Sequence, residues 1–387
     1  MSARVRTDAR LPLWLAGISP LVAVAALLVV FFTLDPIASL REVPPTEAIA
    51  VERTKFRPGE IELRLRNDGP DRVTVAQVLV NDAYWQSEMG DRTLDRLEAR
   101  TLTVTYPWQE GLPVEVVLLT ATGTTIVHEV EVATLTPEPD RRTVVVYALL
   151  GLYMGVAPVA IGLLWFGTIR RVSARSLGFF LAFTVGLLTF LLVDTVEEGV
   201  ELAGRTAVSF DGLALFAIGA LGAAIALSAI ESSSGQTRSH GLVAAYLVAI
   251  GVGLHNLGEG LAVGSAIAVG ELALGRTLVV GFALHNTTEG LAIVSPLGTI
   301  GLPRLWHLAA LGAIAGAPTI VGAWVGGFVF HAAWATLAFG VAAGAIAQVI
   351  WTVAGTLPDR RALIRGLGGV GFMLGLGFMY ATGLLTP

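Results

Sequence analysis

The sequence contains no cysteine and little charge. The absence of cysteine from all 387 residues excludes disulfides, thiolate metal sites and cysteine nucleophiles. Charged residues make up 14% of the chain, whereas a typical soluble domain carries roughly 25%. The net charge of −5 is small and spread out, so it indicates no nucleic-acid partner. With 54% hydrophobic residues, the composition predicts a protein with several membrane-spanning helices.

The chain divides into three regions by composition. In residues 1–41, a basic head with Arg4, Arg6 and Arg10 precedes an apolar run from Leu11 to Leu34. This run is longer than the roughly 7–15 apolar residues of a signal peptide, so we expect a membrane anchor helix. Residues 42–140 contain short runs that alternate apolar and polar residues with a period of two, separated by turn sequences such as Arg57-Pro58-Gly59. That pattern predicts a small all-β sandwich.

Residues 141–387 predict an all-α polytopic membrane bundle. Eight apolar stretches each hold the roughly 20 residues needed to cross the hydrocarbon layer. They cover about 143–168, 176–200, 211–230, 241–269, 275–297, 304–329, 333–355 and 366–385.

Arginine placement predicts the orientation of these helices. With a cytoplasmic N-terminus, eleven arginines fall on cytoplasmic segments: Arg4, Arg6, Arg10, Arg170, Arg171, Arg175, Arg238, Arg304, Arg360, Arg361 and Arg365. Five fall on the other side: Arg41, Arg141, Arg142, Arg205 and Arg276. Because positive residues favour the cytoplasmic side, we expect the β-domain and the C-terminus to be extracytoplasmic.

A polar motif occurs twice inside apolar stretches. His255-Asn256-Leu257-Gly258-Glu259-Gly260 is followed thirty residues later by His285-Asn286-Thr287-Thr288-Glu289-Gly290. A His and a Glu four residues apart share one helix face. Ionisable groups at this depth are costly and are therefore usually functional. The pattern predicts a metal site near the membrane midplane, formed by His255, Asn256, Glu259, His285, Asn286 and Glu289.

Imidazole, carboxylate and amide groups suit zinc, Fe(II), Mn, Co or Ni, and without cysteine they disfavour Cu(I). The two helices are antiparallel, so we expect the six groups to form a ladder along the membrane normal. The structural alternative is that each His is an interhelical hydrogen bonder and each Glu is protonated.

A second polar group predicts an access path for cations. Asp194, Glu198 and Glu201 lie on one face near the outer end of the stretch 176–200, with Glu197 beside them. Such acids attract cations, although a merely solvated helix end would look the same. Gln348, an uncharged polar residue within a span, either lines the path or bonds to a neighbour.

The doubled motif and the eight spans resemble the ZIP (Zrt/Irt-like) family of divalent metal transporters, in particular its bacterial GufA-like branch. The resemblance covers about 143–387 and implies a two-metal centre between the fourth and fifth helices of the bundle, and uptake into the cytoplasm. It also implies a multi-pass protein of the cell (inner) membrane. The family's Pro before each motif Glu is replaced by Gly258 and Thr288, and a Glu-Pro pair on the sixth helix by Ala317-Pro318.

From these observations we expect a transporter of zinc or a similar divalent ion that works by alternating access. The ion is the transported substrate; no organic cofactor and no enzymatic activity are expected. Two alternatives remain: a metal-binding sensor or scaffold without flux, and a membrane-embedded metal hydrolase. The β-domain has three alternative roles: it delivers metal, binds a partner or stabilises a homodimer.

Overall fold

The computed structural model describes residues 13–34, 46–233, 240–268, 272–299, 303–357, 361, 363 and 365–384. The predicted basic head, Arg41, Arg238, Arg360 and the boundary between residues 41 and 42 lie outside these residues. The chain separates into two compact units, residues 1–46 and 47–387. The described part of the first unit is essentially one helix, α1 (Leu13–Leu34), whose described side chains are apolar and largely exposed, as expected of a membrane anchor.

The second unit begins with a small antiparallel β-domain, as predicted. One sheet has the order β1-β2-β7-β5, and the other has the order β4-β3-β8-β9 with β6 paired to β3. The strands are β1 (Ile49–Arg57), β2 (Glu60–Asn67), β3 (Val73–Val80), β4 (Ala83–Tyr84), β5 (Ser87–Glu88), β6 (Thr93–Leu94), β7 (Ala99–Thr105), β8 (Val114–Thr120) and β9 (Thr125–Val130). Alternate residues of both sheets, such as Leu63 and Val116, are buried in one shared core. Gly59 makes the β1–β2 turn with φ +75, a conformation that favours glycine.

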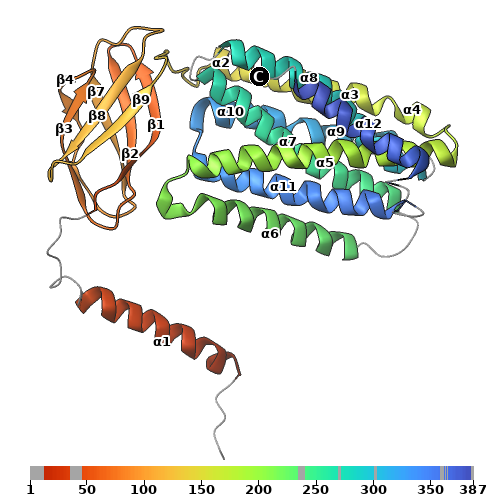
Figure 1. Ribbon diagram of the computed structural model, residues 1–387, viewed down its shortest axis with the longest axis horizontal. Helices are drawn as coiled ribbons and strands as arrows, with labels where there is room; N and C mark the ends of the chain where they lie inside the picture. The colour runs from red at the N-terminus through yellow and green to blue at the C-terminus, as the bar shows by residue number, and fades with distance from the viewer. Residues whose placement is uncertain are drawn as a thin grey trace, which may run out of the picture. The chain divides into compact units, whose positions relative to one another are not determined.

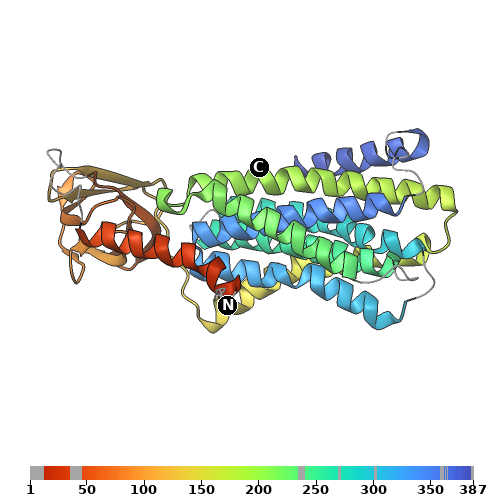
Figure 2. The same cartoon turned by 90° about the horizontal axis from the view of Figure 1, so that it is seen from below.

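The rest of the second unit is a bundle of long apolar helices that run alongside one another (Figure 1, Figure 2). Its elements are α2 (Arg141–Gly151), η2 (Leu152–Val156), α3 (Ala157–Leu163), α4 (Phe166–Ile169), α5 (Ala174–Gly204), η3 (Val208–Phe210), α6 (Gly212–Ser233), α7 (His240–Ala268), α8 (Leu272–Val294), η4 (Ser295–Thr299), α9 (Leu305–Gly316), α10 (Pro318–Val329), α11 (Ala332–Gly355) and α12 (Gly366–Gly383). Among the described residues, eight helical stretches are long and apolar enough to cross a membrane. They coincide with the eight predicted spans to within a few residues, which confirms a helical membrane bundle with a β-domain.

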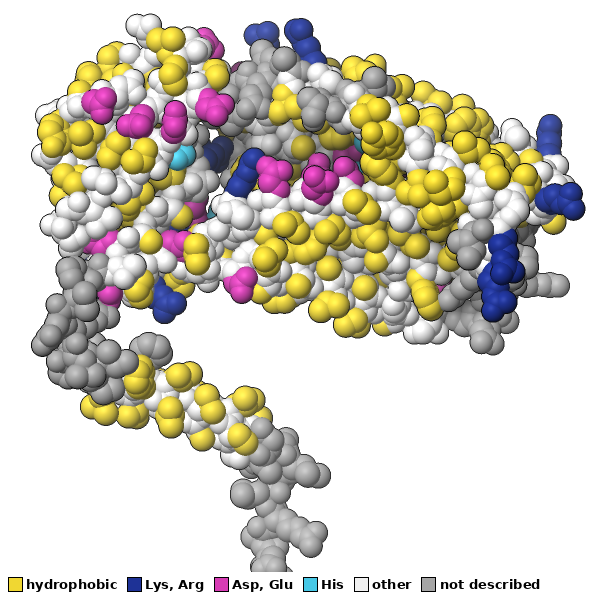
Figure 3. Space-filling model, viewed as in Figure 1, with side chains coloured by type: hydrophobic (Ala, Val, Ile, Leu, Met, Phe, Trp, Pro, Cys, Tyr) yellow, Lys and Arg dark blue, Asp and Glu magenta, His cyan; other side chains and the backbone are white. Residues whose placement is uncertain are grey.

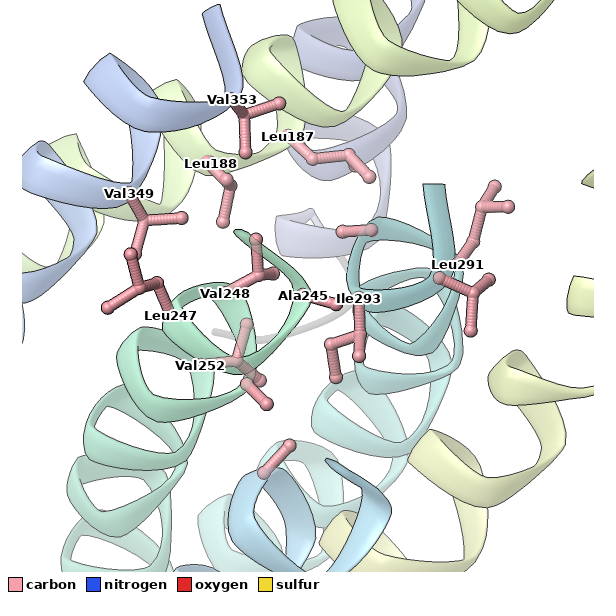
Figure 4. Packing of buried hydrophobic residues seen from close by; sticks show 14 of the residues in the cluster. Leu187, Leu188, Ala245, Leu247, Val248, Val252, Leu291, Ile293, Val349 and Val353 are labelled. Atoms are coloured by element: carbon pink, nitrogen blue, oxygen red, sulfur yellow. The ribbon is translucent and has the colours of Figure 1, made fainter. Parts of the chain in front are cut away.

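Helices α5, α7, α8 and α11 form the centre of the bundle. Figure 4 shows their buried side chains meeting, including Leu188 from α5, Val248 from α7, Ile293 from α8 and Val349 from α11. Residues between 241 and 298 are the most buried of the spans. The two helices that carry the repeated motif therefore bury most of their surface within the bundle, although Val280 and Leu284 of α8 remain exposed.

Two spans are interrupted at a proline. In the first, the π-helical turn η2 precedes Pro158; in the sixth, α9 ends at Gly316 and α10 begins at Pro318. Proline has no N–H to donate, so each interruption leaves carbonyl groups without their usual helical partner. Both interruptions lie beside the polar centre described below.

The β-domain contacts one end of the bundle. The Asp68 carboxylate accepts hydrogen bonds from the backbone N–H groups of Val208 (2.6 Å) and Ser209 (2.8 Å), between α5 and α6. Arg53 donates to the carbonyl of Phe328 near the end of α10. The β-domain thus contacts both the α5–α6 loop and the end of α10. The predicted orientation places these two ends of the bundle and the β-domain on the same side of the membrane, and the contacts are consistent with that.

Candidate metal centre

Three side chains of the repeated motif converge between α7 and α8. His255, Glu259 and His285 each offer a ligand atom, and these atoms lie within 4.8 Å of one another. The three residues are 2%, 2% and 5% exposed, respectively. The convergence follows from the sequence because His255 and Glu259 are one helical turn apart and α8 returns beside α7. The structure therefore brings together three of the six predicted ligands as one compact, buried group.

Glu259 is the central member of this group. Its Oε1 lies 3.3 Å from His255 Nε2 and also contacts His285 Nε2. Its Oε2 accepts a hydrogen bond of 2.7 Å from Asn286 Nδ2. Ligand atoms around a tetrahedral zinc ion at about 2.0–2.1 Å are themselves about 3.3 Å apart. The His255–Glu259 separation therefore suits two ligands of one ion.

Thr195 on α5 fixes the orientation of His255. The Thr195 hydroxyl is buried and donates its single hydrogen to the carbonyl of Leu191 (2.7 Å). It also lies 2.9 Å from His255 Nδ1. Because its hydrogen is already used, the hydroxyl accepts from Nδ1–H, which leaves the lone pair of His255 on Nε2, facing Glu259. Sequence analysis missed this residue, since no spacing rule connects Thr195 to a helix sixty residues away.

The two motif asparagines bond to the interrupted helices. Asn286 Nδ2 donates to the carbonyl of Met154 (2.8 Å), which lies four residues before Pro158 and so has lost its helical donor. Asn256 Nδ2 donates to the carbonyl of Ala315 (3.1 Å), close to Pro318. The prediction gave both side chains only as oxygen donors to metal. In the structure their amide nitrogens also connect α7 and α8 to the neighbouring helices.

The centre is rich in buried acceptors. Of the eight buried side-chain atoms that have no hydrogen-bond partner among the described residues, five belong to the repeated motif: His255 Nε2, Asn256 Oδ1, Asn286 Oδ1 and both carboxylate oxygens of Glu289. Glu289 is 3% exposed and lies outside the compact group of three. Buried polar atoms are normally paired, and one cation can pair with several acceptors at once. Two carboxylates, Glu259 and Glu289, also match the charge of a divalent ion.

Close helix packing surrounds these groups. A Cβ on Gly260 would lie 2.2 Å from the Thr319 carbonyl oxygen on α10, and one on Gly290 would lie 2.5 Å from the Val159 carbonyl oxygen on α3. Only glycine permits these approaches. They hold the motif helices against the two proline-interrupted spans.

Two of the acidic residues of α5 line a cleft near the centre. Glu198 and Glu201 line a cleft of about 570 Å³ together with Leu261, Ala262 and Ser265 of α7, just beyond Glu259. Glu198 is half-buried and its charge interacts with Asp194, His255, Glu259 and His285. Figure 3 shows acidic side chains gathered in a hollow of the bundle, with a basic side chain beside them.

The remaining acids of α5 differ in exposure. Asp194 is half-buried, whereas Glu197 and Glu201 are exposed. Glu201 also pairs with Arg205 at 2.6 Å. Of the four acidic residues, Glu198 and Glu201 line the cleft and Asp194 and Glu197 do not, so the access path stays a prediction.

Gln348 does not line this cleft. Its Nε2 donates to Glu231 Oε2 (2.8 Å), which also accepts from the Thr352 hydroxyl (3.0 Å). Of the two roles considered for Gln348, the structure shows the bond to a neighbour. Glu231, at the end of α6, is the acidic residue that sequence analysis overlooked. The sequence feature that could have identified Glu231 is its position directly after an uncharged apolar stretch.

Comparison with known proteins does not add a family assignment. No family model matches the chain, and no curated protein sequence matches it significantly. The fold and the site define a membrane-spanning helical protein with a buried His/Glu/His group able to bind a metal ion.

Proposed function

We propose that this protein transports divalent transition-metal ions across a membrane, with zinc or a chemically similar ion moving toward the cytoplasm. The observation that carries the proposal is the convergence of His255, Glu259 and His285 from two membrane helices into one buried group. Ionisable residues placed together at this depth typically belong to an ion pathway.

The cleft beside Glu198 supports transport over simple binding. Its lining holds Glu198 and Glu201 together with Leu261 and Ala262, which follow Glu259 on α7. A cation attracted by Asp194 and Glu198 would pass to Glu259 by exchanging carboxylate ligands. Alternating access then requires the helices around the centre to shift, closing this cleft and opening the opposite side. The proposed activity is movement of an ion, without chemical transformation of a substrate.

The ZIP-like character of the bundle is part of this proposal. Its support is the doubled His-Asn-x-x-Glu-Gly pattern on neighbouring helices and the number of spans. Ala317 stands where the family has a Glu, and Asn256 bonds to the neighbouring Ala315 carbonyl. We therefore propose one complete ion site built on Glu259.

The donor atoms limit the choice of ion. Nitrogen and oxygen ligands without sulfur suit Zn²⁺, Mn²⁺, Fe²⁺, Co²⁺ and Ni²⁺. Two imidazoles favour a transition metal over Mg²⁺ or Ca²⁺, which prefer oxygen ligands. A flux assay with a panel of these ions would rank them.

Flux into proteoliposomes tests the proposal. The purified full-length chain is reconstituted into liposomes that enclose a zinc-sensitive dye. Zn²⁺ is then added to the external solution, and the fluorescence of the dye reports its entry. Glu259→Gln and His255→Gln should abolish flux, because each removes a ligand or its charge. Glu110→Gln, in an exposed β-domain loop, and His307→Gln, whose ring bonds to Tyr246 on the bundle, are the matched controls and should retain flux.

The outcome separates the alternatives. Tight Zn²⁺ binding by the intact chain without any flux would favour a sensor or scaffold. Turnover of a lipid or peptide that depends on Glu259 would favour a hydrolase. Either result would overturn the transport proposal.

A further inference from the structure

A cleft of about 400 Å³ lies where the first β-sheet meets the ends of α10 and α11. Four cationic side chains line it: Arg53 and Lys55 from β1, and Arg64 and Arg66 from β2. Two carboxylates, Glu52 and Glu62, and the side chains of Val329, His331 and Trp334 complete its lining. We call this the basic cleft. It lies apart from the metal centre and has no part in the proposed transport.

Two of its arginines face one another across neighbouring strands. Arg53 and Arg64 are direct partners in the β1–β2 register. Like charges at directly opposed positions destabilise a sheet unless an anion lies between them. Arg64 is exposed, and its single protein hydrogen bond is a long one of 3.4 Å to Thr101. Among the described residues, neither arginine forms an ion pair with a carboxylate.

The two glutamates do not neutralise the cleft. Glu52 is shared between Arg66 and His331, and Glu62 is shared between Lys55 (3.4 Å) and Arg57 (3.5 Å). Lys55 and Arg66 are therefore paired with these carboxylates, and Arg53 and Arg64 are the two cationic groups of the cleft that have no carboxylate within ion-pair distance among the described residues. Arg53 is half-buried, and this burial lowers the pKa of its guanidinium below the usual range, against the opposing effect of the Glu62 carboxylate. An anion entering the cleft would find guanidinium groups ready to bind it.

The position of the cleft favours a membrane lipid as the molecule that supplies the anionic group. Val329 ends one membrane span and Trp334 lies in the first turn of the next, and their side chains are 66% and 71% exposed. Exposed tryptophan at the end of a membrane helix is typical of the headgroup level of the bilayer. By this criterion, the cleft opens at the level at which the headgroup phosphates of a bilayer around the bundle would lie.

We propose that the basic cleft binds the phosphate headgroup of an anionic phospholipid, with Arg53 and Arg64 contacting the phosphate and Trp334 packing against the lipid. The lipid would be bound between the β-domain and the bundle. Basic residues at a membrane surface attract anionic lipids in this way.

Lipid binding by the purified full-length chain tests this site. A fluorescent phosphatidylglycerol is titrated into protein in neutral detergent, and its anisotropy gives a Kd. Arg64→Gln should weaken binding about fivefold, and Lys55→Gln combined with Arg64→Gln about 25-fold, from roughly 1 kcal/mol per basic residue. Arg72→Gln, which removes an exposed arginine elsewhere in the β-domain, is the matched control and should bind as the unchanged chain does.

Two competitors distinguish the lipid from other occupants. Phosphatidylcholine with the same acyl chains and inorganic phosphate should both fail to displace the probe. Equal binding of phosphatidylcholine would mean that headgroup charge is not recognised, and displacement by inorganic phosphate would mean that the site takes a free anion. Either result, or an unchanged Kd for Arg64→Gln, overturns the proposal. Because no metal is present in the assay, its outcome is independent of the transport proposal.

Discussion

At the scale of single residues, the candidate metal centre includes a hydroxyl group, that of Thr195, which lies outside the proposed set of ligands. Thr195 accepts from His255 Nδ1 and thereby directs the Nε2 lone pair of His255 toward Glu259. Thr195→Val keeps the shape of the side chain but leaves a buried Nδ1–H without a partner. Outer-shell changes of this kind typically lower metal affinity about 10–100-fold.

We therefore expect Thr195→Val to weaken Zn²⁺ binding by that amount, measured by competition with a chelating dye, and Thr195→Ser to restore it. Thr189→Val is the control, because the Thr189 hydroxyl bonds to a carbonyl of its own helix and lies away from the centre. Equal affinity for Thr195→Val and the unchanged chain would show that the hydroxyl does not orient His255.

The sequence predicted which polar residues would come together better than it predicted their arrangement, and their role as metal ligands stays a prediction. Helical spacing placed His255 with Glu259, and the expected ladder assigned similar roles to all six groups. In the structure His285 pairs with Glu259, while Glu289 lies outside the compact group. Spacing along one helix cannot specify how a neighbouring helix is rotated. The contacts of His255 with Thr195 and of Asn286 with Met154 could therefore not be predicted from it.

At the scale of elements, the packing of α7 against α10 requires glycine. A Cβ on Gly260 would lie 2.2 Å from a backbone oxygen, which cannot move without shifting α10. Gly260→Ala should therefore lower the melting temperature of the purified chain by several degrees. Overpacking of this kind typically costs about 1–3 kcal/mol.

Gly222→Ala is the matched control for this change. Gly222 lies within α6, and a Cβ there would meet no atom within 4 Å. Alanine is the better helix former by about 1 kcal/mol, so this variant should melt at the same temperature or higher. If Gly260→Ala melted no lower than Gly222→Ala, close packing between α7 and α10 would not be needed.

The helices and strands were largely predictable because each follows one simple pattern. Apolar length located the eight spans, and alternation located the main strands. The interruption at η2 was not predicted, because a π-helical turn before Pro158 reflects its neighbours as much as its own sequence. Its partner, Asn286, comes from a helix more than a hundred residues later.

At the scale of the whole molecule, the orientation in the membrane is a prediction from arginine placement. The natural absence of cysteine makes it directly testable, since a single introduced cysteine gives no background labelling. Thr122→Cys, in the β8–β9 turn, should react with a membrane-impermeant maleimide in intact cells. Ser173→Cys, before α5, should react only after lysis. The reverse pattern would invert the proposed direction of transport.

The central claim is that His255, Glu259 and His285 hold one divalent ion together. X-ray absorption at the zinc edge of the Zn²⁺-loaded chain measures this most directly. The account predicts nitrogen and oxygen ligands at about 2.0–2.1 Å, with outer-shell scattering from two imidazoles that falls to one in His285→Ala. A spectrum that His255→Ala and His285→Ala both leave unchanged would contradict it.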